Sequence, residues 1–231
     1  MIQLNKYLKD IISGFLAGFF IGLGGTAFVM CKATLDVNGG LIGAMCFPIG
    51  LFMVCAFGVN LYTGKIGYAF NKEVNTFNPL DFVIMLLANF LGAATIGFIV
   101  YLGAKGNQHL LDTAAAVAQS RAIANPITVL GAFFKSMVCG MLVYVGVYLY
   151  KKCNNYFERA VVIFIPIFLF VFCGFNHCIA DFFYITFGMN VNILSLSFIL
   201  IVVLGNSLGA ILFDRALYLL SKVSKTKEVD N

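Results

Sequence analysis

Two ionisable residues, His177 and Asp181, lie inside the otherwise apolar stretch VFCGFNHCIADFFYITF at 171–187. They are four positions apart, so they would share one face of a continuous helix. Imidazole has a reference pKa of about 6.5 and can therefore exchange a proton near neutral pH. A single polar residue in a helix bundle is often only an interhelical hydrogen bond, but clustered ionisable groups in apolar segments are costly and usually functional. The pattern predicts a site that handles protons or ions.

A second polar interruption follows Gly58, in the apolar run that begins near residue 41. It contains Asn60, Thr63, Gly64, Lys65 and Gly67. Irregular, polar backbone at membrane depth is tolerated only where protein or a water-filled cavity satisfies its polar groups. We therefore expect this interruption and the one around His177 to face each other across a pore within one protomer.

Long apolar runs are the elements that must position these residues. Of the 231 residues, 61% are hydrophobic and only 11% are charged, whereas soluble domains are about a quarter charged. Runs of about 17–25 residues, long enough to span a bilayer, occur at about 11–31, 41–59, 80–103, 126–150, 160–187 and 192–213. The composition predicts an all-α membrane protein with six transmembrane helices and excludes a soluble globular domain.

Lys and Arg are divided unevenly between the two predicted sides of the membrane. If both termini are cytoplasmic, the inner side carries Lys6, Lys9, Lys72, Lys151, Lys152, Arg159, Arg215, Lys222, Lys225 and Lys227, and the outer side carries Lys32, Lys105 and Arg121. The side richer in Lys and Arg is normally cytoplasmic. We expect a multi-pass protein of the cell (inner or plasma) membrane, with a cytoplasmic amphipathic segment at 1–10, a transmembrane domain at 11–213 and a cytoplasmic tail at 214–231.

The two halves of the sequence partly repeat each other. CAFGVNLYT at 55–63 resembles CGFNHCIAD at 173–181, with Cys55 in step with Cys173 and Phe57 with Phe175. Further on, ANFLGA at 88–93 resembles GNSLGA at 205–210. Three spans in each half give the halves opposite orientations, which predicts an inverted 3+3 repeat. Such repeats place a substrate site near the midplane, here between broken second and fifth helices.

Composition and spacing argue against several other classes of site. The seven cysteines form no CxxC pair, so we interpret them as small apolar residues, with no metal and no cofactor. The net charge of +5 comes from basic residues dispersed over loops and the C-terminal tail, which indicates no nucleic-acid partner. Gly14, Gly18 and Gly22 have the spacing of small residues at a close helix–helix contact, and we interpret them as packing.

The sequence allows two functions other than an ion pathway. GNSLG at 205–209 matches the G-x-S-x-G nucleophile pattern, so Ser207 with His177 would suit an intramembrane serine protease. Its counterpart in the first half, ANFLG, has no serine, so the motif is better explained by packing. An aquaporin-like channel for neutral solutes remains an alternative, although the chain has no Asn-Pro-Ala motif.

These segments together resemble one known family, the formate/nitrite transporters. FPIGLFMVCAFGVNLYTG at 47–64 is similar to the family's second-span signature, and GFNHCIADFF at 174–183 is similar to its fifth-span motif. LGNSLGAILF at 204–213 resembles the sixth-span motif, and KSMVCGMLVY at 135–144 more loosely resembles the fourth. The resemblance covers nearly the whole chain, in order.

The resemblance implies an aquaporin-like protomer within a homopentamer in the lipid bilayer, each protomer having its own pore. Its partners would be protons and small monovalent anions of weak acids, such as formate, nitrite or hydrosulfide. The family's central histidine falls on His177 and its threonine on Thr63. The apolar constrictions fall on Phe47, Leu51, Leu61 and Phe170.

This chain departs from the family pattern at several positions. Asn176 replaces the acid before the histidine, Asp181 replaces an asparagine, and Gly140 replaces the fourth-span asparagine. Ala124 stands where the family has a lysine, and Arg121 is the nearest basic residue. Selectivity for formate therefore does not transfer directly.

A mechanism follows from the cost of moving an anion through an apolar constriction. A bare ion loses hydration there at a cost of many kcal/mol, which a weak acid avoids by becoming neutral. We hypothesise that Lys135, Arg121 or helix N-termini attract the anion and that His177 supplies or relays a proton, with Thr63 and Asn176 as hydrogen-bonding partners. Asp181 could keep His177 charged or be protonated itself. It could instead pair with Lys65 or Lys135, which both lie at membrane depth.

Overall fold

The computed structural model describes residues 2–35, 37–71, 76–123 and 125–229, with side chains described from Asn5 to Val223 within those ranges. Lys72 and Ala124, and the side chains of Lys225 and Lys227, lie outside what is described. The described backbone is helical and contains no strand. Its elements are α1 Ile2–Thr34, α2 Gly39–Cys46, α3 Ile49–Ala56, α4 Tyr62–Lys65, a 3₁₀ helix η1 Ile66–Phe70, α5 Pro79–Gly103, α6 Gln108–Gln119, α7 Pro126–Lys152, α8 Tyr156–Phe172, α9 Cys178–Phe187 and α10 Ile193–Val229.

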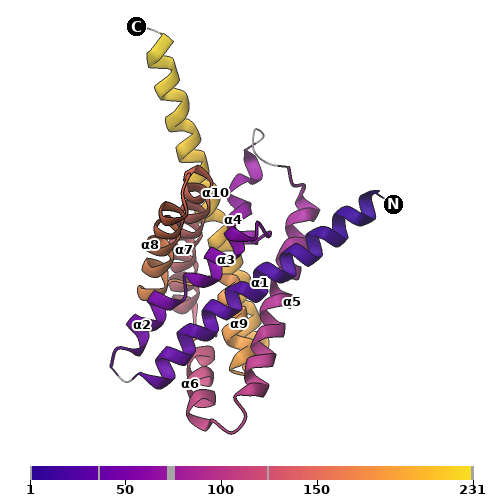
Figure 1. Cartoon of the computed structure of the whole chain (residues 1–231), viewed down its shortest axis with the longest axis vertical. Coiled ribbons are helices and arrows are strands. Elements are labelled where there is room, and N and C mark those ends of the chain that lie inside the picture. Colours follow the sequence, from indigo (N-terminus) through magenta and orange to yellow (C-terminus); the bar gives the residue numbers. More distant parts are fainter. Residues whose placement is uncertain (1, 36, 72–75, 124, 230–231) are drawn as a thin grey trace.

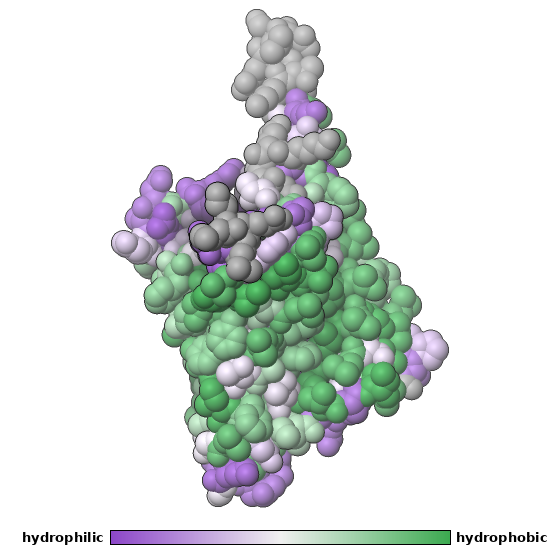
Figure 2. Space-filling view, turned by 90° about the vertical axis from the view of Figure 1, so that its right-hand side faces the viewer, coloured by the Kyte–Doolittle hydropathy of each residue, from purple (hydrophilic) through white to green (hydrophobic). Residues whose placement is uncertain are grey.

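Most of the surface in the middle of the molecule is apolar. Five helical stretches in the described part of the chain are long and apolar enough to cross a bilayer: Asn5–Thr34, Gly39–Ala56, Pro79–Gly103, Pro126–Lys152 and Ile193–Val223. Figure 2 shows a continuous hydrophobic band between two hydrophilic ends. The chain is therefore a multi-pass membrane protein. In Figure 1 the two termini lie toward one end, and α6 and the turn between α1 and α2 lie at the other.

Asparagine caps set the starts of the long helices. The side chain of Asn78 accepts a hydrogen bond from the backbone N–H of Asp81, and the Asp81 carboxylate accepts one from the backbone N–H of Asn78. Asn125 makes the same reciprocal pair with Thr128. These contacts satisfy N–H groups that a helix leaves unpaired at its first turn. The predicted boundaries at 10/11 and 213/214 fall inside α1 and α10, so they do not coincide with the ends of helices.

Glycines bring helices into backbone contact at two equivalent places. A Cβ atom added to Gly18 of α1 would lie 1.9 Å from the carbonyl oxygen of Asn89 in α5. A Cβ atom added to Gly140 of α7 would lie 2.1 Å from the carbonyl oxygen of Asn206 in α10. The interpretation of Gly18 as a packing residue is confirmed. The same closeness leaves no room at position 140 for the asparagine that the family resemblance leads one to expect.

Helices α3 and α8 end in the same way. Gly58 and Gly174 have φ angles of +65° and +67°, which glycine adopts without the steric cost that a Cβ atom brings. The next N–H, of Val59 or Phe175, donates to the carbonyl oxygen of Val54 or Phe170 at 3.1 and 2.9 Å. This is the Schellman pattern that terminates helices. The chain then continues without helix through 57–61 and 173–177 before α4 and α9 begin.

These helix ends correct the register of the sequence repeat. Gly58 corresponds to Gly174, so Phe57 corresponds to Cys173 and not to Phe175 as the sequence comparison had it. The comparison had matched apolar residue types, whereas the turn conformation depends on the glycine. The predicted pairing of Cys55 with Cys173 is therefore wrong by two positions.

Candidate functional site

His177 occupies the N-cap of α9, with its ring held by two contacts. Its Nδ1 accepts a hydrogen bond from the backbone N–H of Ala180 at 3.2 Å, and its Nε2 lies 2.8 Å from Oγ1 of Thr63. Because a backbone N–H can only donate, Nδ1 carries the lone pair in neutral imidazole and the proton resides on Nε2. Nε2–H then donates to the Thr63 hydroxyl. Both side chains are buried, at 2% and 0% exposure.

The segment before α4 is fixed by Asn89, a fully buried residue in the middle of α5. Its side-chain oxygen accepts from the N–H of Tyr62 at 2.8 Å. Its side-chain nitrogen donates to the carbonyl oxygens of Gly14 at 2.7 Å and Asn60 at 3.0 Å. One side chain thus satisfies backbone groups that the interrupted helix exposes.

Asn206 of α10 makes the same set of contacts for the segment before α9. Its oxygen accepts from the N–H of Cys178 at 2.9 Å, and its nitrogen donates to the carbonyl oxygens of Ser136 at 2.8 Å and Asn176 at 2.9 Å. The sequence comparison had noted that Asn89 and Asn206 correspond, and had explained them by packing. In the structure they hold the two interrupted segments, and so they position Thr63 and His177.

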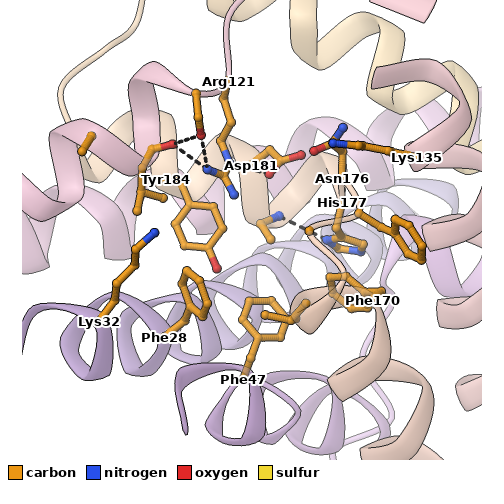
Figure 3. Close-up of a pocket in the computed structure, with 17 residues that line it drawn as sticks. Phe28, Lys32, Phe47, Arg121, Lys135, Phe170, Asn176, His177, Asp181 and Tyr184 are labelled. Atoms are coloured by element: carbon orange, nitrogen blue, oxygen red, sulfur yellow. Dashed lines mark hydrogen bonds and ion pairs between the residues drawn. The ribbon is translucent and has the colours of Figure 1, made fainter. Parts of the chain in front are cut away.

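A cavity of about 370 Å³ opens on one side of His177. We name it the His177 cavity. Its walls come from α1, α6, α7, α8 and α9 and carry the cations Lys32, Arg121 and Lys135, and Figure 3 shows these residues around it. Asn176 and Asp181 also line it. The predicted residues Arg121, Lys135, Asn176, His177 and Asp181 therefore meet at one cavity.

Aromatic rings form the wall of this cavity next to His177. The rings of Phe47 and Phe170 meet edge to face, with centroids 5.6 Å apart, and Phe170 stacks on the imidazole at 5.8 Å. Both phenylalanines are buried and line the cavity. Leu51 and Leu61 are buried as well, and Leu61 lines a different cavity. All four predicted constriction residues are thus buried, two of them at the His177 cavity and one at another cavity. Their role as constrictions stays a prediction.

Asp181 pairs with Arg121. Nε of Arg121 lies 2.6 Å from Oδ1 of Asp181, whose side chain is 2% exposed. From the sequence alone, Lys65 or Lys135 is the expected ionic partner of Asp181. The only ion pair of Asp181 among the described residues is the one with Arg121. That lies 60 positions away in the sequence, and no local pattern indicated it.

A second cavity of about 210 Å³ is lined by residues that precede and follow Thr63 in the chain. We name it the Lys65 cavity. Its lining includes Leu61 and Gly64, which flank Thr63 in the chain, and two cations, Lys65 and Lys151. The buried hydrogen bond thus links His177, which lines the first cavity, to Thr63, whose neighbour Gly64 lines the second, and both cavities carry lysines.

Sequence reasoning missed two of the lysines. Lys32 and Lys151 were counted only as charges of the outer and inner sides, although each lines a cavity. Both lie near the end of a long apolar helix. That position was a usable signal, because a lysine near a helix end can extend its charged group toward an aqueous space.

The geometry around Ser207 does not support a serine nucleophile. Its hydroxyl donates to the carbonyl oxygen of Val203 at 2.6 Å and lies 2.8 Å from the hydroxyl of Tyr62. Both nitrogens of His177 are engaged by Thr63 and Ala180, so the imidazole does not serve as its base. Within the described part of the chain, no group of three or more His, Cys, Asp or Glu residues is placed to hold a metal ion.

Solved structures share this fold. A pentameric formate channel with formate bound superposes with a TM-score of 0.79 over 95% of this chain and 98% of that one, at 20% sequence identity. An ion channel of the FNT family gives a TM-score of 0.79 over 95% and 92%, at 21% identity. At these identities the likeness is one of fold.

Sequence comparisons extend the likeness to family membership. The formate channel FocA of Haemophilus influenzae is 28% identical over 196 residues, which cover 78% of this chain and 66% of that protein, just under two thirds of its length. A probable formate transporter of Methanothermobacter thermautotrophicus is 27% identical over 240 residues, covering 91% and 87%. The family model for formate/nitrite transporters matches residues 3–220. The chain therefore belongs to the formate/nitrite transporter family, a family of transport proteins and not of enzymes.

Proposed function

We propose that this protein conducts small monovalent anions of weak acids, with formate as the first to test and nitrite and hydrosulfide as further candidates. The observation that carries the proposal is the buried hydrogen bond between Thr63 and His177, at 2.8 Å, which links a residue of one lysine-bearing cavity to a residue whose chain neighbours line another. The names of the relatives support formate in particular, since several are formate channels or transporters.

The path has the charge and polarity that a weak acid requires. Lys32 and Lys135 make the His177 cavity attractive to an anion, and Phe47 and Phe170 then offer an apolar passage. A charged species is strongly disfavoured in such a passage, whereas its protonated form is not. The imidazole Nε2–H that faces Thr63 is the nearest proton donor, because Nδ1 is occupied by the N–H of Ala180. A proton from solution first converts the ring to imidazolium, at the expense of the contact between Nδ1 and the N–H of Ala180. Transfer of one proton from the imidazolium to the anion returns the ring to neutral imidazole, and the acid crosses uncharged.

The proposed topology has six crossings in two inverted halves, with both termini cytoplasmic. In this arrangement α2 to α4 together make the second crossing and α8 with α9 make the fifth. The matching contacts of Asn89 and Asn206, and the matching turns at Gly58 and Gly174, support the inverted repeat. The arrangement resembles that of aquaporins in having two interrupted helices at the midplane.

We also propose a homopentamer. One solved structure with this fold is described as a pentameric formate channel, and the apolar helices of a single chain present much exposed hydrophobic surface. Exposed residues of α7 such as Ile127, Leu130 and Phe134 would face a neighbouring protomer or lipid.

Uptake into proteoliposomes tests the proposal. We expect the wild type to take up formate, nitrite or hydrosulfide faster as external pH falls, because protonation at His177 then becomes easier. His177→Asn should lose this pH dependence and most of the flux. His109→Asn is the matched control, because His109 is the other histidine of the chain and lies exposed on α6.

Three results would count against the proposal. Unchanged flux and pH dependence in His177→Asn for all three anions would remove the proton step. An anion current of equal size at every pH would indicate a plain channel. Rapid swelling of the vesicles in glycerol, without anion flux, would favour a neutral-solute channel.

A further inference from the structure

The side chain of Arg121 is restrained on several sides. Its Nε donates to Asp181 at 2.6 Å, and its Nη1 donates to the carbonyl oxygen of Val117 at 2.5 Å and lies 3.1 Å from the hydroxyl of Ser120. Its guanidinium carbon lies 4.2 Å from the centre of the Tyr184 ring. A guanidinium stacked and bonded in this way is a fixed charge and not a freely moving ligand.

Asp181 is fixed with respect to His177. Its backbone N–H donates to the carbonyl oxygen of His177 at 2.8 Å, in the first turn of α9. Its Oδ1 is bonded to Arg121, while its Oδ2 is buried without a hydrogen-bond partner among the described residues. Figure 3 shows the pair at the wall of the His177 cavity, which Asp181 lines. Beside the proposed anion path, one carboxylate oxygen therefore has no hydrogen-bond donor among the described residues.

The net charge on the lining of this cavity depends on whether Arg121 and Asp181 neutralise each other. Arg121 and Asp181 cancel each other, and the positive charge that remains on the lining is that of Lys32 and Lys135. Neither lysine has an ion pair with a described residue. Without Arg121, the carboxylate would oppose these lysines from within the same cavity. Charges inside a protein interact more strongly than in bulk water, so an uncompensated Asp181 would repel an anion that approaches His177.

We propose that Arg121 is the counter-ion of Asp181, and that this pair determines the charge selectivity of the His177 cavity, whereas Lys32 and Lys135 attract the anion. The proposal rests on the proposed anion conduction and deepens it. It replaces the expectation that Arg121 itself attracts anions. It also gives a reason for a carboxylate at a position where the family has an asparagine: the chain supplies the matching arginine from the end of α6.

A double-mutant cycle tests this pair. Formate flux and the formate-to-sodium permeability ratio, from reversal potentials, would be measured in proteoliposomes at one pH for wild type, R121Q, D181N and R121Q/D181N. We expect R121Q to lower flux by about tenfold and to reduce anion selectivity, a size typical of coupled charge pairs. D181N should raise flux at low formate concentration, because Arg121 is then uncompensated. The double variant should recover to within about threefold of wild type.

Lys135→Gln is the matched comparison. It should lower flux to a similar extent in the wild-type and D181N backgrounds, because Lys135 has no ion pair with Asp181. R121K should keep most of the selectivity, since it keeps the positive charge.

Each alternative gives a different result. If Arg121 binds the anion directly, R121Q and the double variant will be equally impaired, and the counter-ion role is overturned. If R121Q does not fold, the double variant against wild type decides between the first two roles, because direct anion binding by Arg121 predicts impaired flux in it and the counter-ion role predicts recovery. A merely structural pair would change thermal stability but leave the permeability ratio unaltered. Absence of any anion flux in the wild type would overturn the proposed function itself and this proposal with it.

Discussion

His177 combines two roles that usually fall to different residues. Its Nδ1 caps α9 through the N–H of Ala180, and its Nε2 faces Thr63. A proton taken up at Nδ1 would break the cap, because both the ring nitrogen and the backbone N–H would then be donors. The cap therefore favours one tautomer of neutral imidazole and keeps the proton on the nitrogen that faces the other half of the molecule.

Replacing Thr63 by valine should show what the Nε2 contact is worth. The side chains have nearly the same shape, so Thr63→Val would mainly remove the acceptor and leave Nε2–H buried without a partner. We expect a loss of about 1–3 kcal/mol of stability, seen as lower thermal stability in detergent, together with reduced formate flux. Thr63→Ser, which retains the hydroxyl, should keep most of both. Equal losses in the two variants would contradict the assigned hydrogen bond.

At this scale the sequence predicted which residues gather at the site but not all their contacts. His177, Asn176 and Asp181 adjoin one another in the chain, and Thr63 followed from the family resemblance. The partner of Asp181 could not be inferred, because Arg121 comes close only when α6 packs beside α9. Several basic residues were available as partners, and spacing along the chain does not discriminate among contacts made by folding.

At the scale of the elements, the interruptions after α3 and α8 depend on single glycines. Gly58 and Gly174 have positive φ angles, and a Cβ atom at either would meet no atom within 4 Å. A substitution there would thus cost backbone strain alone, without a steric clash with neighbours. The turn releases the chain from the helix and lets the following residues reach Asn89 or Asn206.

Alanine at these glycines should weaken the interruptions in a way that can be separated from packing. Gly58→Ala and Gly174→Ala should each cost about 1–2 kcal/mol, the penalty for an L-residue in the left-handed region. Gly103→Ala is the matched control: it also meets no atom within 4 Å but has no positive φ angle, so its thermal stability should not fall. Equal effects at all three positions would argue against a strained turn.

Five of the six apolar runs expected from hydropathy correspond to helical stretches long enough to span a bilayer, whereas the run at 160–187 is divided into α8 and the shorter α9. The sequence placed one apolar run at 41–59, and the structure divides this region into α2 and α3 before the turn at Gly58. The register of the repeat was also misjudged by two residues. Hydropathy reports how apolar a segment is. The position of the turn depends instead on a positive φ angle at one residue, which glycine adopts readily and which composition does not reveal.

At the scale of the whole molecule, the hydrophobic band in Figure 2 lies between two hydrophilic ends. If the band lies in a bilayer, these two ends face opposite sides of the membrane. Lys151, Lys152 and Arg159 gather at the connection between α7 and α8, and this end is expected to be cytoplasmic. Cys153 lies in the same connection, directly after α7, and gives a natural reporter of orientation.

A membrane-impermeant maleimide should modify Cys153 only when the cytoplasmic face is exposed. In intact cells, we expect no label at Cys153 and strong label at the variant Lys105→Cys, in the connection between α5 and α6. In inside-out vesicles, the pattern should reverse. Mass spectrometry of the labelled peptides distinguishes these sites from the other cysteines, and Cys153→Ser is the control. Labelling of Cys153 in intact cells would contradict the proposed topology and indicate the opposite orientation.

The lysines of the two cavities have a further consequence for the direction of transport. Lys32 and Lys135 stand at one cavity and Lys65 and Lys151 at the other, so an anion meets an attractive site whichever way it approaches. A pore with a capture site at one mouth alone would rectify. If the two cavities are the two mouths of the proposed pore, we expect flux in both directions without rectification, so that the gradients of anion and proton set the direction of net transport.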